Sequence, residues 1–418
     1  MAGRKKVVVV GGGFAGIELV KKLDERLFDI TLIDKLNHHQ FQPLFYQVAT
    51  SQIEPSSISF PLRNIFKKKK NLHIRLAEVE EIIGSQKIIK SDIGNFHYDY
   101  LIIAIGCETN FYGNKELEKN CLTLKSTYDA IRIRNHILLV FEKIISASED
   151  EKESLLNLVI VGAGPTGVEL AGAFAEIKKD ILPKDYPGID FSKFRIILVE
   201  GSKNTLNNMS ANASRASQKY LEDIGVEIFR ETMVKNYDGE TIRFHNGQEV
   251  RTKTVIWAAG VKANTIAGIS STELIAGNRI KVDRFNKVFR SENIFAIGDI
   301  AYMETPLYPK GHPQVANVAI NQAVRLAKNL NFLIKGKVMK EFEYHDLGSM
   351  ATVGRNKAVV DLSFIKLQGY FAWLIWMFLH LMLILSVKNK LIIFINWAWA
   401  YVTKNTSLRL ILTDKKRS

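Results

Sequence analysis

Two glycine-rich turns constrain the fold most strongly, because each follows a run of Val and Ile and precedes an apolar helical pattern. The first lies in VVVVGGGFAGIELVKKL at 7–23, and the second lies in LVIVGAGPTGVELAGAF at 158–174. A glycine turn between a buried strand and a helix is typical of a dinucleotide-binding βαβ unit. The sequence therefore predicts an α/β chain with two Rossmann-like dinucleotide-binding domains.

The glycines of the first turn have separate roles. Gly11 permits the tight turn, Gly13 lets the backbone approach a pyrophosphate, and Gly16 lets the following helix pack against the strand. Asp34 ends the next strand-like segment, ITLID, where a carboxylate can accept hydrogen bonds from ribose hydroxyls. This combination predicts a dinucleotide site rather than a purely structural turn.

The second turn repeats the pattern with Gly162, Gly164 and Gly167, and Glu200 ends the strand that follows. The number of residues between this turn and Glu200 is larger than usual because of an insertion containing LPKDYPG. A carboxylate at Glu200 would repel the 2′-phosphate of NADPH, and no arginine occupies the adjacent turn. We therefore expect this domain to bind NADH rather than NADPH.

The segments after each turn show how the chain is organised. LHIRLAEVEEI, QKIIKSD and FHYDYLIIAIG predict short antiparallel strands that end on a buried strand at 100–105, and the segment 226–260 repeats that arrangement. IFAIGDIA at 294–301 brings the chain back to the first domain. A charged stretch, 146–154, is interpreted as a linker between domains. The expected domains are 1–119 with 266–345, then 120–265, and a C-terminal region, 346–418.

Charge and cysteine content narrow the class of protein. The net charge of +14 favours anionic surfaces, but no nucleic-acid recognition motif accompanies it, so we expect no nucleic-acid partner. Cys107 and Cys121 have no redox spacing and are interpreted as structural thiols in a reducing compartment. The chain starts without an apolar signal region, which predicts residence in the cytosol. His38 and His39 lack partner ligands at metal-site spacing, so no metal is expected.

The C-terminal region is apolar and aromatic. The run 369–387 contains only one ionisable residue, His380, and its length permits a transmembrane helix, whereas the apolar stretch 391–402 is too short to cross back. Five aromatic residues suit a membrane interface: Trp373, Trp376, Trp397, Trp399 and Tyr401. Lys404, Arg409 and the basic end suit anionic headgroups. We expect attachment to a lipid surface, with a single span, packing on the first domain or packing across a homodimer as alternatives.

The ordered motifs resemble those of the two-dinucleotide-domain flavoprotein reductases, and one branch in particular, the type II NADH:quinone oxidoreductases. The resemblance rests on HHQFQPLFYQVATSQIEPSSISFPLR at 38–63, PTGVELAG, WAAGVKA, GHPQVANVAINQA, GSMATVGRNKAVVDL, AWLIWMFLHLMLIL and SLRLIL. It implies FAD in the first domain, NADH in the second, and a membrane quinone as electron acceptor, without ion pumping. It also implies monotopic attachment to the cytoplasmic side of the inner membrane, as a homodimer.

The resemblance assigns residues to FAD and NADH. The FAD residues would be Gly11, Gly13, Phe14, Ala15, Gly16, Asp34, Pro43, Gln47, Ala104, Gly106, Gly298, Asp299, Val318 and Ala319. The NADH residues would be Gly162, Gly164, Pro165, Thr166, Gly167, Glu169, Glu200, Ala259 and Gly260. Asp299 at a strand end would accept hydrogen bonds from the ribityl chain. Glu169 is the candidate catalytic residue, for substrate positioning or proton handling; the alternative is an early-helix acid favoured by the helix dipole.

The family's quinone helix carries Ala-Gln-x-x-x-Gln, which here matches Ala316, Asn317 and Asn321, followed by Gln322. Both glutamines are asparagines in this chain, so the amides remain on arms that are one methylene shorter. This departure leaves the fit of the quinone open, and both menaquinone and ubiquinone remain candidates. Gln322 is a further candidate unless it points away from the site.

Three other functions share part of this sequence pattern. A sulfide:quinone reductase shares the domains and the membrane end but needs cysteines that flank the flavin, which Cys107 and Cys121 match poorly. A soluble reductase with another acceptor would lack the apolar tail. A flavoprotein that binds nucleic acid would account for the charge, but the basic residues are dispersed apart from 67–70 and the C-terminal end.

Overall fold

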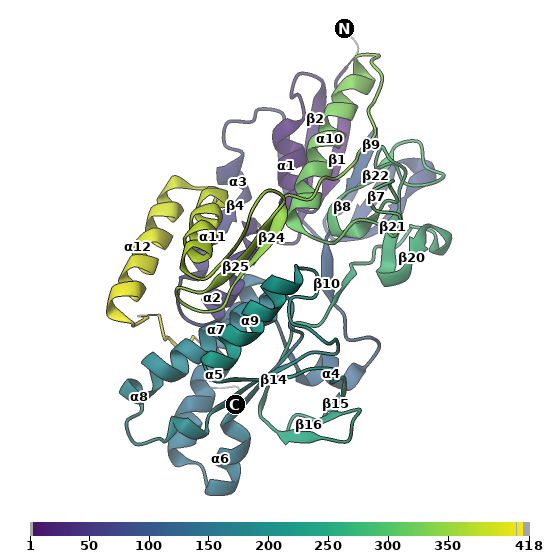
Figure 1. The fold of residues 1–418 in the computed structure, drawn as a ribbon. Coiled ribbons are helices and arrows are strands. Elements are labelled where there is room, and N and C mark those ends of the chain that lie inside the picture. Colours follow the sequence, from purple (N-terminus) through teal and green to yellow (C-terminus); the bar gives the residue numbers. More distant parts are fainter. Residues whose placement is uncertain (1–2, 407, 413–418) are drawn as a thin grey trace. The chain divides into compact units, whose positions relative to one another are not determined.

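The computed structural model describes residues 3–406 and 408–412, and it contains two compact units (Figure 1). Unit 1 comprises 1–40, 60–108 and 261–346, and unit 2 comprises 41–59, 109–260 and 347–418. Both units are built from α/β layers, which confirms the predicted fold class.

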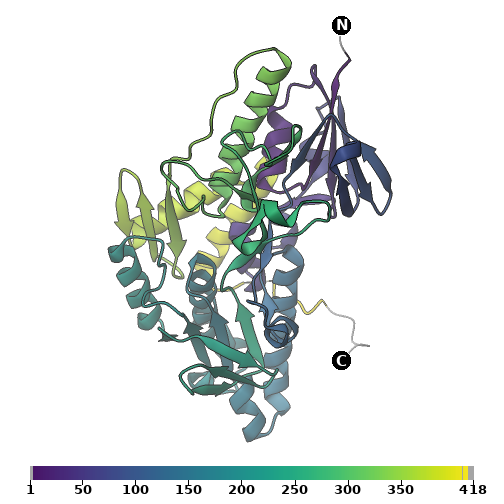
Figure 2. The same ribbon diagram turned by 90° about the vertical axis from the view of Figure 1, so that its right-hand side faces the viewer.

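Unit 1 is built on a five-stranded parallel sheet in the order β22-β9-β1-β2-β5. The strands are β22 (Ile294–Ala296), β9 (Tyr100–Ile103), β1 (Lys5–Val10), β2 (Phe28–Asp34) and β5 (Leu72–Leu76). Helices α1 (Phe14–Lys22) and α10 (Ala316–Ile334) lie side by side against one face (Figures 1 and 2). The return of β22 to this sheet confirms the role expected for IFAIGDIA.

The antiparallel interpretation of LHIRLAEVEEI is wrong in its first half. β5 pairs with β2 in parallel, and the antiparallel strands are β6 (Val79–Ile83), β7 (Ile88–Ser91) and β8 (Gly94–His97). Only Ile74 of β5 is buried, because β5 is the edge of the main sheet. An edge strand with one wet face has the same alternating pattern as an antiparallel strand, so periodicity cannot separate the two.

Unit 2 repeats the architecture with the strand order β11-β18-β12-β13-β14, all parallel. The strands are β11 (Leu122–Thr123), β18 (Thr254–Trp257), β12 (Asn157–Val161), β13 (Arg195–Val199) and β14 (Val226–Phe229). Antiparallel strands β15 (Val234–Tyr237), β16 (Thr241–Phe244) and β17 (Glu249–Arg251) follow β14. The major helices are α5 (Thr127–Ser146), α7 (Pro165–Asp180) and α9 (Ala211–Asp223). The prediction of two copies of one architecture is confirmed.

The stretch interpreted as a linker, 146–154, is mostly helical. α6 spans Glu149–Leu155, and Ser148 and Glu151 form a reciprocal capping box at its start. Arg251 pairs with Asp150 at 2.8 Å and with Glu153 at 3.2 Å. The charges that suggested a linker therefore form the solvated face of a short capped helix.

The C-terminal part of unit 2 consists of a small sheet and two helices. The sheet contains β24 (Gly348–Thr352), β25 (Ala358–Leu362) and β26 (Lys366–Gln368), and the helices are α11 (Tyr370–Leu383) and α12 (Val387–Thr403). The run 369–387 does not form one helix, because Ile384 has an extended backbone that ends α11. Among the described residues, no helix is both long enough and apolar enough to cross a membrane.

The shorter elements complete the chain. The remaining strands are β3 (His38–Gln40), β4 (Ser59–Pro61), β10 (Cys107–Thr109), β19 (Val261–Ala263), β20 (Leu274–Ile275), β21 (Arg279–Lys281) and β23 (Ala301–Tyr302). The remaining α-helices are α2 (Phe45–Ala49), α3 (Leu62–Ile65), α4 (Lys115–Asn120) and α8 (Leu182–Asp185).

Candidate functional site

The first glycine-rich turn leaves room for a ligand only where the sequence predicts one. A Cβ on Gly11 would lie 2.3 Å from the carbonyl oxygen of Ala104, and one on Gly16 would lie 1.8 Å from that of Gly11. By contrast, no heavy atom of the described chain stands within 4 Å of a Cβ on Gly13, the N-cap of α1. No side chain of the described residues caps this helix. Uncapped N–H groups beside open space fit a pyrophosphate.

Asp34 is fixed at the end of β2 by the backbone of the turn. Its Oδ2 accepts a hydrogen bond from the Gly12 N–H, and its Oδ1 accepts one from the Leu36 N–H at 2.6 Å. Burial raises the pKa of this carboxyl above its ordinary value, and the two N–H donors lower it. A carboxylate held in this way has lone pairs left for ribose hydroxyls.

The turn after β22 gathers the other predicted FAD residues of unit 1. Gly298 has a φ of 76°, and a Cβ on it would lie 3.3 Å from the Cβ atoms of Ala15 and Ala319. Asp299 follows, and its Oδ2 accepts a hydrogen bond from the Cys107 thiol at 2.9 Å. Three segments far apart in sequence therefore meet closely at this turn.

The remaining predicted FAD residues lie at several places. Val318 is buried in the adjoining core, Phe14 begins α1, and Gly106 follows β9 with a φ of 69°. Pro43 and Gln47 lie in unit 2.

The candidate quinone residues on α10 differ in their surroundings. Asn321 is exposed and donates from Nδ2 to the Asn317 carbonyl at 2.7 Å, while Ala316 and Asn317 are half-buried. Gln322 is buried, and its Oε1 accepts a hydrogen bond from the Gly298 N–H at 2.7 Å. Gln322 therefore supports the turn next to Asp299.

The second glycine-rich turn reproduces the geometry of the first. A Cβ on Gly162 would lie 2.8 Å from the Ala258 carbonyl, and one on Gly167 would lie 1.9 Å from the Gly162 oxygen. Gly164, the uncapped N-cap of α7, has no described heavy atom within 4 Å of a Cβ, and the residues after it, Pro165 and Thr166, are exposed. Gly260, which follows Ala259 after β18, has a φ of 88°.

Glu200 occupies the place that Asp34 has in unit 1. Its Oε2 accepts a hydrogen bond from the Ala163 N–H and its Oε1 accepts one from the Ser202 N–H, both at 2.8 Å. In each unit, an acid at the end of the second strand thus binds the second residue of the glycine turn. Both acids that the sequence analysis selected therefore lie against a glycine-rich turn.

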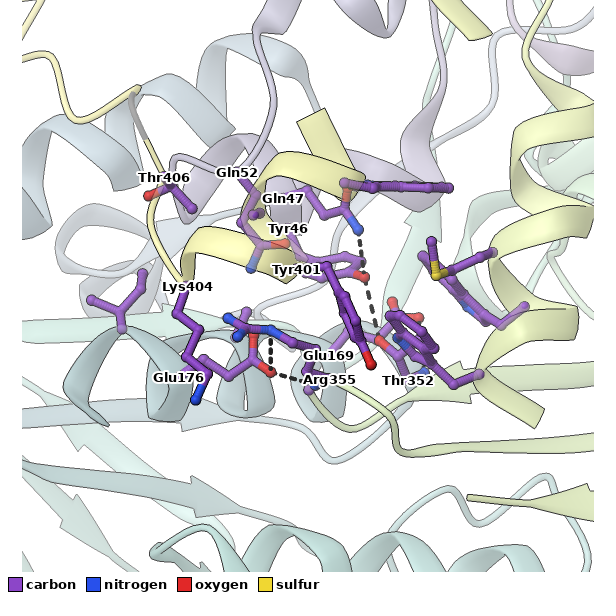
Figure 3. Close-up of a pocket in the computed structure, with 18 of the residues that line it drawn as sticks. Tyr46, Gln47, Gln52, Glu169, Glu176, Thr352, Arg355, Tyr401, Lys404 and Thr406 are labelled. Atoms are coloured by element: carbon purple, nitrogen blue, oxygen red, sulfur yellow. Dashed lines mark hydrogen bonds and ion pairs between the residues drawn. The ribbon is translucent and has the colours of Figure 1, made fainter. Parts of the chain in front are cut away.

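Glu169 lies in a pocket of unit 2 with about 740 Å³ of free space, part of it open to solvent (Figure 3). The pocket is lined by α2 and the residues after it, by α7, by the β24–β25 turn, and by α11, α12 and the residues after α12. Its aromatic walls are Tyr46, Trp373, Trp376, Trp397 and Tyr401. Glu169 lies beyond the first turn of α7 and is only 8% exposed.

Burial controls the ionisation of this pocket. It raises the pKa of Glu169 to about 8, and the Thr352 N–H, which lies 3.5 Å from the carboxyl, and the nearby Trp376 indole lower it only partly. Burial also raises the pKa of Tyr46, and the charge of Glu169 raises it further. Glu169 is therefore mostly protonated near neutral pH and can both give and take a proton.

A chain of polar contacts runs from α12 to Glu169. The Trp397 Nε1 donates to Gln47 Oε1 at 2.8 Å, Gln47 Nε2 donates to the Tyr46 hydroxyl at 3.0 Å, and that hydroxyl lies 3.3 Å from Thr352 Oγ1 (Figure 3). Sequence reasoning missed Tyr46, Thr352 and Trp397 as site residues. No local signal marks them, because their contacts join segments hundreds of residues apart.

An ion-pair cluster stands at the other end of the same pocket. Glu176 on α7 accepts a hydrogen bond from the Arg355 N–H, and the Arg355 guanidinium lies 3.4 Å from Asp180. Burial raises the pKa of Glu176, and the charge of Arg355 lowers it. The β24–β25 turn approaches α7 closely here, since a Cβ on Gly172 would lie 2.7 Å from the Gly354 nitrogen.

The two adjacent histidines take part in the scaffold of unit 1. His39 is buried, its Nδ1 lies 3.3 Å from the Gly12 carbonyl oxygen, and its ring meets Phe14 edge-on at 4.9 Å. Burial lowers the pKa of His39 to about 4, so the ring is neutral. In the described part of the chain, no three His, Cys, Asp or Glu side chains form a cluster able to hold a metal ion.

The comparisons with known proteins agree on one family. Residues 5–323 match the pyridine nucleotide-disulphide oxidoreductases, and residues 346–405 match the NDH2 C-terminal domain. The type II NADH:quinone oxidoreductase Ndh of Mycobacterium tuberculosis is 34% identical over 99% of this chain and 91% of its own length. A type II NADH:quinone oxidoreductase of Haemophilus influenzae is 29% identical over 90% of this chain and 93% of its own.

Solved structures show the same fold. NDH2 of Plasmodium falciparum, in complex with NADH, superposes with a TM-score of 0.89 at 22% identity and covers 98% of this chain and 100% of its own. The sulfide:quinone oxidoreductase of Aquifex aeolicus superposes with a TM-score of 0.74 at 20% identity and covers 96% of both chains. The resemblance expected from the sequence motifs is confirmed, and the chain belongs to the pyridine nucleotide-disulphide oxidoreductase family, in the branch of the type II NADH:quinone oxidoreductases.

Proposed function

We propose that this chain oxidises NADH and passes the two electrons through FAD to a membrane quinone, without pumping ions. The observation that carries the proposal is the aromatic pocket of unit 2. Side chains of α11 and α12 line this pocket beside Glu169, a buried acid on α7, the helix that follows the second glycine-rich turn. The names of the relatives from Mycobacterium tuberculosis and Haemophilus influenzae supply the substrates, NADH and quinone.

The residues of unit 1 fit FAD. The open space beside Gly13 and the uncapped start of α1 suit its pyrophosphate, Asp34 suits the ribose hydroxyls, and Asp299 suits the ribityl hydroxyls. We propose Ala15, Gly298 and Ala319 as the closely packed backbone and methyl groups around it. When bound, FAD supplies the two-electron chemistry that links a hydride donor to a quinone.

The residues of unit 2 fit NADH. Gly164 would admit the pyrophosphate, and Glu200 would accept hydrogen bonds from the adenosine ribose. A 2′-phosphate would have to approach that same carboxylate and would be repelled by it. Hydride transfer needs no acid or base from the protein, so the contribution of this unit is to bind and orient the nicotinamide.

Quinone reduction needs protons as well as electrons, and Glu169 is the group suited to supply one. Its pKa of about 8 keeps a proton on it near neutral pH, and the apolar walls around it suit a hydrophobic ring. We propose that the quinone enters this pocket and that Glu169 delivers a proton to the reduced ring. Asn317 and Asn321 of unit 1 stay a separate proposal for binding quinone carbonyls, and menaquinone and ubiquinone are both candidates.

The C-terminal helices offer a surface for lipid. Phe371, Phe378 and Val402 are exposed by 72%, 62% and 79%, and Lys388 and Lys390 stand at the start of α12. Exposed apolar side chains beside cations suit an anionic membrane surface. We propose monotopic attachment through α11 and α12 to the cytoplasmic side of the inner membrane, and a homodimer as the assembly.

The proposal is tested by comparing electron acceptors on the Glu169→Gln variant. Ferricyanide accepts electrons without protons, so NADH:ferricyanide activity should stay within about twofold of the wild type, while quinone reduction should fall at least about tenfold. If both activities fell equally, or if quinone reduction were unchanged, Glu169 would have no role in protonating the quinone.

A further inference from the structure

A second pocket of unit 2 contains a buried cation that forms no ion pair with any described residue. It has about 1050 Å³ of free space, part of it open to solvent, and it is lined by α2, α5, α7, α8 and the described residues after α12. Arg134 projects into it from α5 and is only 1% exposed. The proposed NADH:quinone reaction makes no use of this pocket.

Two nitrogens of the Arg134 guanidinium, Nε and Nη2, are available to bind a ligand. Neither Nε nor Nη2 has a hydrogen-bond partner in the described part of the chain. These two nitrogens form the Nε–Nη2 edge of the guanidinium, which can donate two parallel hydrogen bonds to one carboxylate or phosphate. The same chain shows that use elsewhere, since the Nε and Nη2 of Arg195 bind the Glu227 carboxylate at 2.8 and 2.6 Å.

The acids that line the pocket are already occupied. Asp185 pairs with Arg409 at 2.6 Å, and Glu142 accepts a hydrogen bond from the Tyr186 hydroxyl at 2.8 Å. No described acid lies within 4.0 Å of Arg134, and the more distant Glu54 compensates only part of its desolvation. Because a guanidinium does not lose its proton at physiological pH, a buried one that pairs with no described acid would be stabilised by a bound anion.

Most of the remaining lining residues are apolar. Ile137, Phe141, Phe174, Leu182 and Ile411 supply the walls, and the hydroxyls of Thr50 and Ser51 stand among them. The residues after α12 are held along the pocket by Asn135, which donates to the Leu412 carbonyl and accepts from the Leu412 N–H, both at 3.1 Å. A free inorganic anion would satisfy the guanidinium but would leave these apolar walls uncovered.

We propose that this pocket binds an anionic amphiphile, whose carboxylate or phosphate head lies on the Nε–Nη2 edge of Arg134 and whose hydrocarbon chain covers the apolar walls. Two sources share this chemistry, a free fatty acid and a phospholipid from the membrane. The proposal does not depend on which quinone is reduced, or on whether quinone is the acceptor.

The test compares three forms of the full-length protein, with FAD bound and in a neutral detergent. Arg134→Met removes the cation, and Arg132→Met is the matched control, because Arg132 is exposed two positions away on α5, where it lies over the Tyr128 ring. Binding of decanoate, decanol and inorganic phosphate is measured by calorimetry. The wild type and Arg132→Met should bind decanoate at least tenfold more tightly than decanol, and Arg134→Met should lose that preference. Inorganic phosphate should bind at least tenfold more weakly than decanoate.

Equal affinity of the wild type for decanoate and decanol, or an unchanged preference in Arg134→Met, would overturn the proposal. If Arg134→Met failed to fold, Arg134→Lys would replace it: it keeps the charge but lacks the two-nitrogen edge, so its decanoate preference should fall at least threefold. An unchanged preference in Arg134→Lys would then count against the oxyanion edge. Competition separates the sources, because displacement of decanoate by phosphatidylglycerol vesicles supports the membrane lipid, and lack of displacement supports the free acid.

Discussion

At the scale of single residues, the pKa of Glu169 gives the quinone half-reaction a distinct pH dependence. Burial raises this pKa to about 8, so the carboxyl is protonated below that pH and loses its proton above it. We expect quinone reduction by the wild type to fall as the pH rises through about 8. NADH:ferricyanide activity should not show this step, and Glu169→Gln should lose it. A step that persisted in Glu169→Gln would assign the titration to another group.

A second prediction at this scale concerns the choice of nucleotide. Glu200 is held on the second glycine turn by the N–H groups of Ala163 and Ser202. Glu200→Gln removes its charge but keeps an amide oxygen for the ribose, so repulsion of a 2′-phosphate disappears. We expect the ratio of kcat/KM for NADH over NADPH to fall about tenfold. Steady-state kinetics with both nucleotides measure it, and an unchanged ratio would refute the role given to Glu200.

At the scale of elements, neighbouring glycines of one turn should respond differently to the same substitution. A Cβ on Gly13 meets no described atom within 4 Å, whereas one on Gly16 overlaps the Gly11 carbonyl. Gly13→Ala should therefore fold with nearly wild-type stability but bind FAD at least about tenfold more weakly, because the methyl group occupies the pyrophosphate's place. Gly16→Ala should lower the free energy of unfolding by about 4 kcal/mol or more.

Flavin content and denaturant titration of the cofactor-free protein measure the two effects. Normal flavin binding by Gly13→Ala would mean that the open space beside α1 is not the phosphate site. Gly164→Ala extends the comparison to the second turn, where KM for NADH should rise while the flavin content stays unchanged.

Elements whose signal is local could be predicted from the sequence. The glycine turns, the acids Asp34 and Glu200 and the return strand β22 follow from short-range patterns, and the structure places them in two matching sheets. The pairing direction of β5 could not be predicted, because an edge strand of either kind has one wet face. The series of polar contacts from Trp397 through Gln47 and Tyr46 to Thr352 could not be predicted either, because only tertiary packing brings these residues together.

At the scale of the whole molecule, the membrane is the proposed source of the quinone. Phe371 and Phe378 stand two turns apart on α11 and are exposed. Replacing both with Ser should lower binding to anionic vesicles at least about tenfold, because each buried aromatic ring contributes about 1.5–3 kcal/mol. Vesicle flotation measures the loss, and Val338→Ser, which changes an apolar residue that is 87% exposed in unit 1, is the control. Unchanged flotation of the double variant would place the lipid contact elsewhere.

The central claim, electron transfer from NADH to a quinone, is tested most directly by anaerobic stopped-flow absorbance of the purified protein. The protein is first mixed with NADH and then with menaquinone or ubiquinone analogues, and the first mixing is repeated with NADPH. We predict rapid bleaching of the flavin absorbance by NADH, slow bleaching by NADPH, and rapid recovery of the absorbance with at least one quinone. Bleaching by NADH without recovery by any quinone would contradict the claim and would identify the chain as an NADH oxidoreductase with another acceptor.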